Sequence, residues 1–382
     1  MRKLWLIFAQ SATVTLAVVF VLSLLRPDLI PLRSQVVPVT EAPSQTAALS
    51  GDKQGVQSLS KAARKAMPSV VNISTSKEVS VPTYPFLEDP SLRRFFDERF
   101  KGQRQKQYSL GSGVIVSPKG YILTNHHVIE AADEILIAFS DGRSAAAKVV
   151  GADPETDLAV LRVKLDNLPA ITFGRAEQVR VGDFVLAIGD PFGVGQTVTM
   201  GIISATGRSR LGINTFENFI QTDAPINPGN SGGALVDTNG DLLGINTAIV
   251  SKSGGSQGIG FSIPVSLARN VMDQLIRTGS VTRGWIGVEV QDLTPALAES
   301  FRAFEKHGAL VADTVRGGPA ERAAVRPGDL LVAVNGQPVS DSASMLNLIA
   351  ELQPGQEATL NVLREKQELA LKVTVGRRPK PQ

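Results

Sequence analysis

The alternation of apolar and polar positions between residue 70 and about residue 263 predicts a long series of short β-strands. Apolar, β-branched runs recur there, separated by turn sequences such as Ser117-Pro118-Lys119-Gly120 and Asn239-Gly240. Many short strands at this spacing are typical of a sandwich or barrel rather than of βαβ units. We expect strands at Val70–Ile73, Gly113–Val116, Tyr121–Thr124, Ile135–Phe139, Leu158–Val163, Phe184–Ile188, Leu235–Val236, Leu242–Ile245 and Gly260–Ile263. Residues 82–107, with prolines and mixed charge, predict a long loop.

A smaller α+β region follows at residues 282–376. The spacing of Leu267, Val271, Leu275 and Ile276 predicts an amphipathic helix over Ser266–Arg277 that joins two domains. Beyond it, strands are expected at Trp285–Val290, Ala309–Ala312, Leu330–Val334 and Ala358–Leu363, and helices near Ala320–Ala323 and Ser342–Glu351. We therefore expect two folded domains, at residues 58–278 and 279–378.

The amino terminus carries an uncharged, mostly apolar run of 22 residues, Leu4 to Leu25, preceded by Arg2 and Lys3. As a helix with a rise of ~1.5 Å per residue, it would span a hydrocarbon core of ~30 Å. A cleaved signal peptide is the alternative, but its apolar stretch is usually ~7–15 residues and ends at a small-residue cleavage site. No clear Ala-x-Ala follows here. We expect residues 1–26 to be an uncleaved transmembrane anchor, with the remaining chain translocated out of the cytoplasm.

Residues 27–57 are rich in Pro, Ser, Thr, Gln and Ala and have no sustained periodicity, which predicts a flexible linker. A short helix is expected from Ser58 to Met67, ended by Pro68.

Composition removes several classes of function. The net charge is only +3 and no basic stripe with interleaved aromatic residues occurs, so we expect no nucleic-acid partner. The absence of cysteine excludes disulfides, thiolate catalysis and cysteine zinc sites. No metal or cofactor site is apparent in the sequence.

Gly229-Asn230-Ser231-Gly232-Gly233 is the first candidate for chemistry. A serine between glycines can occupy a tight turn where backbone N–H groups converge, and those of Gly229 and Ser231 would form an oxyanion hole around the Gly229-Asn230-Ser231 segment. The motif also fits the nucleophile elbow of α/β-hydrolases. In that fold the catalytic histidine follows the serine and the serine opens a helix. Here the only later histidine is His307, and Ser231 leads into a predicted strand.

The base must then be His126 or His127, since both precede the serine in Thr124-Asn125-His126-His127-Val128. Asp157 suits the acid, because it follows a turn and begins the apolar strand Leu158-Ala159-Val160-Leu161, where a carboxylate can be buried beside the imidazole. The order His, Asp, Ser is that of chymotrypsin-like enzymes. The residues leave the choice between the two histidines open.

The segments Thr-Asn-x-His-Val, Thr-Asp-Leu-Ala-Val-Leu and Asn-Pro-Gly-Asn-Ser-Gly-Gly-Ala-Leu closely resemble those of the HtrA/Deg serine proteases, and the resemblance runs from about Ala66 to the end. It implies a mainly β fold, a chymotrypsin-like double β-barrel followed by a small α+β PDZ domain. It selects His127, with Asp157 and Ser231, as the triad of a serine endopeptidase, and leaves His126 as a surface residue.

The resemblance also implies further site residues. Asn246-Thr247-Ala248-Ile249 matches the strand that pairs with the substrate, which assigns Thr247, Ala248 and Ile249 to substrate binding. Ile259, Gly260 and Phe261 match a wall of the specificity pocket, where no acid is present to select Lys or Arg, so small aliphatic side chains are expected. Arg208 falls where membrane-anchored members of the family keep a sensor arginine on a regulatory loop.

Residues 282–376 resemble a PDZ domain of the permuted bacterial kind. Trp285, Ile286, Gly287 and Val288 match the loop whose backbone N–H groups bind a peptide's terminal carboxylate, and the peptide would add a strand to the sheet. Trp285 departs from the tyrosine or leucine common at its position.

One such domain behind an uncleaved anchor resembles the DegS/AlgW type of the family. That type implies a homotrimer at the inner membrane, with its domains in the periplasm. It binds the carboxyl termini of misfolded outer-membrane proteins and cleaves a membrane-spanning anti-sigma factor in the envelope stress response. A general quality-control protease and chaperone, which would degrade unfolded proteins, is the alternative.

Overall fold

The computed structural model describes residues 58–80, 104–130, 132–191, 195–249, 256–294, 307–365 and 367–379, with Trp5, Gln10, Ser11, Thr13, Val14 and Leu297. Ser58–Gln382 forms one compact unit and Met1–Gln57 another. Within the described part of the chain, no helix has the length and apolar character needed to cross a membrane. The predicted anchor, residues 1–26, falls almost entirely outside the described residues, and the linker, residues 27–57, falls wholly outside them.

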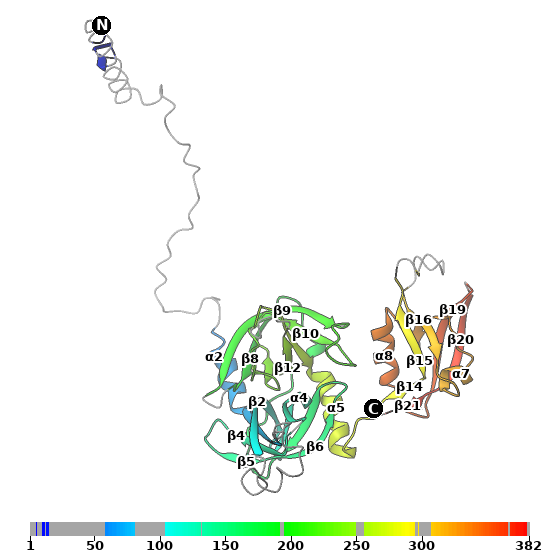
Figure 1. The fold of residues 1–382 in the computed structure, drawn as a ribbon, viewed down its shortest axis with the longest axis horizontal. Helices are drawn as coiled ribbons and strands as arrows, with labels where there is room; N and C mark the ends of the chain where they lie inside the picture. The colour runs from blue at the N-terminus through cyan, green and yellow to red at the C-terminus, as the bar shows by residue number, and fades with distance from the viewer. Residues whose placement is uncertain are drawn as a thin grey trace, which may run out of the picture. The chain divides into compact units, whose positions relative to one another are not determined.

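The first β-unit, in which Figure 1 labels β2, β4, β5 and β6, is an antiparallel sheet of seven strands in the order β5-β4-β1-β2-β3-β7-β6. Its interior is filled by the β-branched and leucine side chains that alternate along the strands, such as Ile73, Ile115, Ile122 and Leu161. The strands are β1 (Val70–Ser80), β2 (Arg104–Ser117), β3 (Tyr121–Thr124), β4 (Glu134–Ala138), β5 (Ser144–Ala146), β6 (Lys148–Asp153) and β7 (Leu158–Arg162).

The second β-unit closes into a barrel in the order β10-β13-β12-β11-β8-β9. Closure leaves no unpaired strand edge in this unit. Its strands are β8 (Phe184–Gly189), β9 (Thr197–Arg208), β10 (Phe219–Thr222), β11 (Ala234–Val236), β12 (Leu242–Ile249) and β13 (Gly260–Pro264). A 3₁₀ turn, η4 (Ala176–Gln178), precedes β8.

Two helices join the β-units into one domain. A single apolar cluster contains residues of α2 (Ser60–Ala66), of α5 (Val265–Thr278) and of strands from both units. The amphipathic α5 buries Ala268, Val271 and Leu275 on one face and ends at Gly279, whose φ of 73° provides the left-handed cap. After α2 the chain turns through η2 (Met67–Ser69) into β1.

The carboxyl-terminal domain has its own apolar core. Its main sheet runs β15-β16-β17-β19-β20, with β18 paired to β17, so β15 is an edge strand, and α8 lies along the sheet (Figure 1). The elements are β14 (Gly284–Trp285), β15 (Val288–Asp292), β16 (Ala309–Thr314), α7 (Pro319–Arg322), β17 (Leu330–Val334), β18 (Gln337–Pro338), α8 (Ser342–Ala350), β19 (Glu357–Arg364), β20 (Gln367–Thr374) and β21 (Gly376–Arg377).

The structure corrects three expectations. The strand predicted at Trp285–Val290 is two strands, β14 and β15, because the chain turns at Gly287 with a φ of 75°. Arg104–Gln107, expected in a loop, belong to β2, while residues 82–103 lie outside the described residues. Seven strands, β5, β6, β9, β10, β18, β20 and β21, were not predicted. Of these, β18 and β21 have only two residues each, and most positions of β5, β6, β9 and β20 are exposed or half-buried, which weakens the apolar alternation.

Candidate active site

His127, Asp157 and Ser231 converge from three elements. His127 lies on α4 (His126–Ile129), which follows β3, Asp157 directly precedes β7, and Ser231 lies in the turn before β11. The Nδ1 atom of His127 is 2.7 Å from Oδ2 of Asp157, and the backbone N–H of His127 donates to Oδ1 at 2.9 Å. The carboxylate therefore fixes the ring so that Nε2 is free to act as a base.

The environment keeps Asp157 ionised. Burial of the carboxyl opposes its negative charge, but hydrogen bonds from the His127 ring and backbone and from Thr247 outweigh that effect, and they place the pKa of Asp157 below its ordinary value. A negative carboxylate is the form that stabilises an imidazolium.

Ser231 is held away from the base in this conformation. Its hydroxyl donates to the carbonyl of Thr247 at 3.2 Å, and these two fully described side chains, Ser231 and His127, share no hydrogen bond. The candidate acid and the candidate base are thus hydrogen-bonded to each other, whereas the candidate nucleophile is not bonded to the base.

The turn before Ser231 depends on glycine. Gly229 has a φ of +94° and Gly232 a φ of +83°, and a Cβ on Gly232 would lie 2.1 Å from the Ser112 carbonyl oxygen. Asn230 is buried, and its N–H donates to the Asn227 carbonyl at 3.0 Å. Within the described residues the N–H groups of Gly229 and Ser231 have no hydrogen-bond partner. Both are therefore available to an oxyanion.

Thr247 has a contact that sequence reasoning missed. Its hydroxyl donates to Oδ2 of Asp157 at 2.7 Å, on the carboxylate oxygen that also bonds His127. The β12–β13 pairing has a register shift between Asn246 and Ala248, so Thr247 has no paired residue on β13 and interrupts the regular alternation of side chains between the two faces of the strand. The only sequence signal was a polar residue inside an apolar strand. Ala248 and Ile249 continue β12 beside it.

The predicted pocket wall is mostly closed in this conformation. Phe261 is 2% exposed and its ring centroid lies 5.8 Å from that of Phe219. Gly260 is buried, and Ile259 alone of the three presents an exposed side chain. His126, expected at the surface, is less exposed than His127 (19% against 47% of the side chain), and its buried Nδ1 has no partner within the described residues.

The turn that carries Asp157 is bonded by residues far along the chain. Arg283 forms a buried ion pair with Asp153 and a second one with Glu155 at 3.3 Å, and Arg378 reaches Glu155 at 2.8 Å. The guanidinium of Arg283 also stacks over the ring of Phe216, 4.3 Å from its centroid. Two arginines that flank the carboxyl-terminal domain are thus attached to the turn of the candidate acid.

The loop after Arg208 bonds the same turn. Asn214 donates to the Thr156 carbonyl at 3.2 Å, and the Phe216 N–H donates to the Glu155 carbonyl at 3.0 Å. Buried Glu217 holds this loop by accepting three backbone N–H groups, from Leu211, Ile213 and Asn214. We call residues 209–217 the linking loop. Arg208 itself, at the end of β9, donates to the Gln221 side chain at 2.8 Å.

The linking loop also contacts the carboxyl-terminal domain. Arg210 pairs with Asp292, with 3.2 Å between their charged atoms, and with Asp341, the N-cap of α8. Asn347 of α8 donates to the Glu217 carbonyl at 3.2 Å.

The residues Trp285, Ile286, Gly287 and Val288 lie where β14 leads into the edge strand β15. Within the described residues no acceptor is found for the N–H groups of Ile286 and Gly287. Edge strand and free N–H groups together suit the addition of an extended peptide with a terminal carboxylate.

Comparison with known proteins identifies the family. Residues 111–245 match the trypsin-like peptidase domain and residues 284–375 the PDZ domain. A probable periplasmic serine endoprotease, DegP-like, from Chlamydia trachomatis is 44% identical over 86% of this chain and 69% of its own length. Its counterpart from Halomonas elongata is 46% identical over 83% and 70%. The chain belongs to the HtrA family of serine proteases.

Similar solved structures support the same family assignment. The HtrA-type protease AlgW with a decapeptide shares 53% identity with a TM-score of 0.73, covering 85% of this chain and all of AlgW's. A serine endoprotease from Yersinia pestis shares 39% identity with a TM-score of 0.61, covering 85% and 100%. The predicted fold, a chymotrypsin-like protease domain followed by one PDZ domain, is confirmed, as is the prediction of a serine endopeptidase. The periplasmic relatives indicate the same compartment for this HtrA protease.

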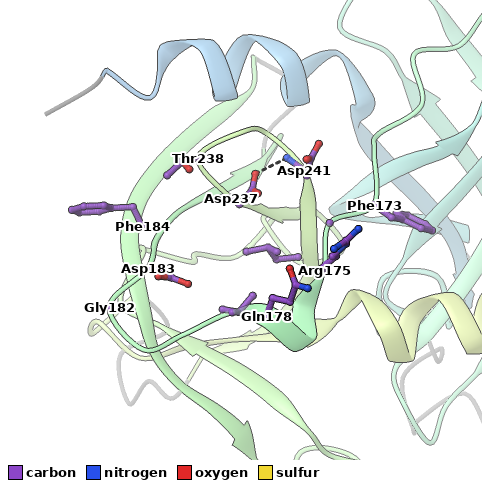
Figure 2. A pocket seen from close by; sticks show the side chains of 12 residues that line it. Phe173, Arg175, Gln178, Gly182, Asp183, Phe184, Asp237, Thr238 and Asp241 are labelled. Carbon is purple, nitrogen blue, oxygen red and sulfur yellow. Dashed lines mark hydrogen bonds between the residues drawn. The ribbon is translucent and has the colours of Figure 1, made fainter. Parts of the chain in front are cut away.

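A pocket of about 630 Å³ lies elsewhere in the second barrel, between η4, β8 and the 237–241 turn (Figure 2). Arg175 and Gln178 approach it from one side, and Asp237 and Asp241 from the other. Its lining does not include His127, Asp157 or Ser231. Among the described residues no group of His, Asp or Glu side chains is placed to hold a metal ion.

Proposed function

We propose that this HtrA protease is a peptide-activated serine endopeptidase, anchored in the inner membrane by residues 1–26 and facing the periplasm. Its PDZ domain would bind the exposed carboxyl termini of misfolded outer-membrane proteins. Its protease domain would then cleave a membrane-spanning anti-sigma factor and so start the envelope stress response. The observation that carries the proposal is the turn of Asp157, which is bonded both by arginines flanking the PDZ domain and by the linking loop.

The proposed chemistry is acyl transfer through a covalent intermediate. Ser231 attacks the peptide carbonyl while Nε2 of His127 accepts its proton, and Asp157 stabilises the imidazolium. The N–H groups of Gly229 and Ser231 hold the oxyanion, and His127 then protonates the leaving amine. Water, deprotonated by His127, then attacks the acyl-enzyme ester, and cleavage of the ester releases the second product and regenerates the Ser231 hydroxyl.

A resting state of low activity is supported by the hydroxyl of Ser231, which donates to the carbonyl of Thr247 and not to His127. Peptide binding can activate the enzyme only as far as it favours the conformation in which the Ser231 hydroxyl donates to His127 instead of to the Thr247 carbonyl. The contacts that differ between the two states would be those of Arg210 and Asn347, because they join the PDZ domain to the linking loop of the protease domain. Arg208, bonded to Gln221 beside the linking loop, is the proposed reporter of that change.

Support also comes from the AlgW structures, which hold a decapeptide and a tripeptide, and from the PDZ domain at residues 284–375 of this chain. A homotrimer is expected from the family resemblance. A general quality-control protease is the second candidate, because the curated relatives are DegP-like.

Two substrates separate the candidates. We expect the purified full chain to cleave the periplasmic part of a membrane-spanning anti-sigma factor only when carboxyl-terminal peptide is present, and to leave an unfolded reporter protein largely intact. Efficient, peptide-independent degradation of the reporter would favour the quality-control role. Ser231→Ala should abolish either activity, by about a million-fold for a triad nucleophile.

A further inference from the structure

Ser112 of β2 lies beneath the turn that carries the nucleophile and is completely buried. Its hydroxyl donates to the carbonyl of Gly229 at 2.6 Å, and its backbone N–H donates to the carbonyl of Ser231 at 2.8 Å. The two residues whose N–H groups form the proposed oxyanion hole are therefore both held, through their carbonyls, by one residue of the first β-unit.

The same hydroxyl has a second bond. It accepts the N–H of Asp190 at 2.8 Å, and the Asp190 carbonyl accepts the side-chain amide of Asn72 at 2.7 Å. Asn72 and Ser112 are paired residues of β1 and β2. Ser112 Oγ thus links the chain after β8 to the chain before Ser231, donating one hydrogen bond and accepting another.

Gly229 needs such a contact because it has no side chain to restrict its rotation. Its φ of +94° is accessible to glycine, but glycine also reaches negative φ at similar cost. A change at Gly229 would turn its N–H away from the oxyanion position. A short hydrogen bond to its carbonyl fixes the following peptide plane and so limits that freedom.

We propose that Ser112 is a positioning residue for the oxyanion hole, which acts by holding Gly229 and Ser231 in register rather than by touching substrate. The proposal rests on the proposed catalytic role of Ser231 and of the N–H groups of Gly229 and Ser231. It predicts that loss of the hydroxyl weakens binding of the tetrahedral transition state while binding of the ground-state peptide is kept.

The test compares Ser112→Ala with a matched control, Thr222→Val, in the full chain. Thr222 is also completely buried, donates to a backbone carbonyl (Ile202, 2.7 Å) and accepts a backbone N–H (Ala224, 3.1 Å). Each variant removes one such hydroxyl. We would measure kcat and KM for peptide cleavage, the inhibition constant of a peptide boronic acid, whose adduct with Ser231 places an oxygen in the oxyanion hole, and thermal stability.

For Ser112→Ala we expect kcat to fall about 10- to 100-fold, somewhat less than for direct loss of an oxyanion donor. KM should stay within about threefold of wild type, and the boronate inhibition constant should rise in parallel with the loss of kcat. Thr222→Val should lose a similar amount of thermal stability but keep the wild-type kcat and boronate inhibition constant. An unchanged kcat, or an equal loss of kcat in both variants, overturns the proposal. If Ser112→Ala does not fold, Ser112→Cys decides: a several-fold lower kcat at unchanged KM supports the proposal, and a wild-type kcat overturns it.

Ser231→Ala in the same assay separates this inference from the proposed function. Wild-type activity in Ser231→Ala would refute the proposed triad itself. Loss of activity in Ser231→Ala together with wild-type activity in Ser112→Ala would refute only the role of Ser112.

Discussion

At the scale of single residues, Asp157 organises the candidate site. It accepts hydrogen bonds from the His127 ring, the His127 backbone and the Thr247 hydroxyl, and its own carbonyl accepts the Asn125 side chain at 3.0 Å. A φ of 57°, uncommon for a residue with a side chain, accompanies this arrangement. The carboxylate is therefore positioned by several independent bonds.

Thr247→Val should lower kcat about 10- to 100-fold, since a hydrogen bond to a charged group is worth about 1.5–3 kcal/mol and here it orients the carboxylate that holds His127. Steady-state kinetics at saturating peptide would measure the effect, with Thr222→Val as the control. A kcat within twofold of wild type would remove Thr247 from the positioning of the acid.

The lowered pKa of Asp157 predicts a pH dependence of stability. Because the folded-state pKa lies below the unfolded value of ~3.9, the ionised carboxylate contributes stability that is fully present above about pH 4 and is lost as pH falls further, through the folded pKa. Urea unfolding of wild type and Asp157→Asn from pH 3 to 7 would show this. Their difference in unfolding free energy should be constant at neutral pH and shrink below about pH 4. A difference that instead shifts in favour of the wild type as the pH falls from about 7 to 4 would mean that burial dominates and the pKa is raised.

At the scale of elements, the linking loop at residues 209–217 connects β9 to β10 and touches both the turn of Asp157 and the PDZ domain. Its shape depends on Glu217, whose carboxylate replaces the regular hydrogen-bond partners that the loop backbone lacks. Arg208 lies where this loop leaves β9.

Arg208→Ala should lower peptide-stimulated cleavage at least several-fold and leave PDZ binding of the peptide unchanged, because the arginine bonds Gln221 of the protease domain and, among the described residues, has no hydrogen bond or ion pair with the PDZ domain. Stimulated activity and peptide affinity, by fluorescence anisotropy, would be measured together. Arg175→Ala, which removes an exposed arginine at the rim of the pocket in Figure 2, is the control and should match wild type. Unchanged stimulation in Arg208→Ala contradicts the sensor role.

Sequence patterns predicted most strands whose apolar side chains alternate or are continuously buried, such as β3 and β17, which begin and end where expected. They failed for β9, whose surface-facing residues include Met200 at 59% exposure, and for the break at Gly287. The order of the motifs, together with the family resemblance, predicted His127, Asp157 and Ser231 as the triad, and the structure places these three residues close together in the fold. The bonds of Thr247, Arg283 and Ser112 could not be predicted, because each joins residues that only the packed structure brings together.

At the scale of the whole molecule, two kinds of ion pair join the protease and PDZ domains. Arg283 is buried with Asp153 and Glu155, so its removal would leave the buried Asp153 carboxylate without a cation and cost about 3–5 kcal/mol of stability. Arg210 is half-exposed, and pairs of that kind contribute about 0–1 kcal/mol. The first pair suits a fixed attachment and the second a contact that peptide binding can break.

Arg210→Ala should therefore raise the activity without peptide by at most about fivefold and leave the activity at saturating peptide unchanged, if its pairs with Asp292 and Asp341 favour the resting state. Arg143→Ala, which removes a comparably exposed ion pair with Asp141 in the first β-unit, provides the control. Lower basal activity in Arg210→Ala would show instead that the contact supports the active state.

The most direct test of regulated proteolysis is the peptidase activity of the purified full chain, measured with a library of carboxyl-terminal peptides and with the same peptides amidated at the carboxyl terminus. We predict very low activity without peptide, saturable stimulation by free-carboxylate peptides, little or none by the amidated ones, and no activity in Ser231→Ala. Full activity without peptide, or equal stimulation by the amidated peptides, would contradict the account.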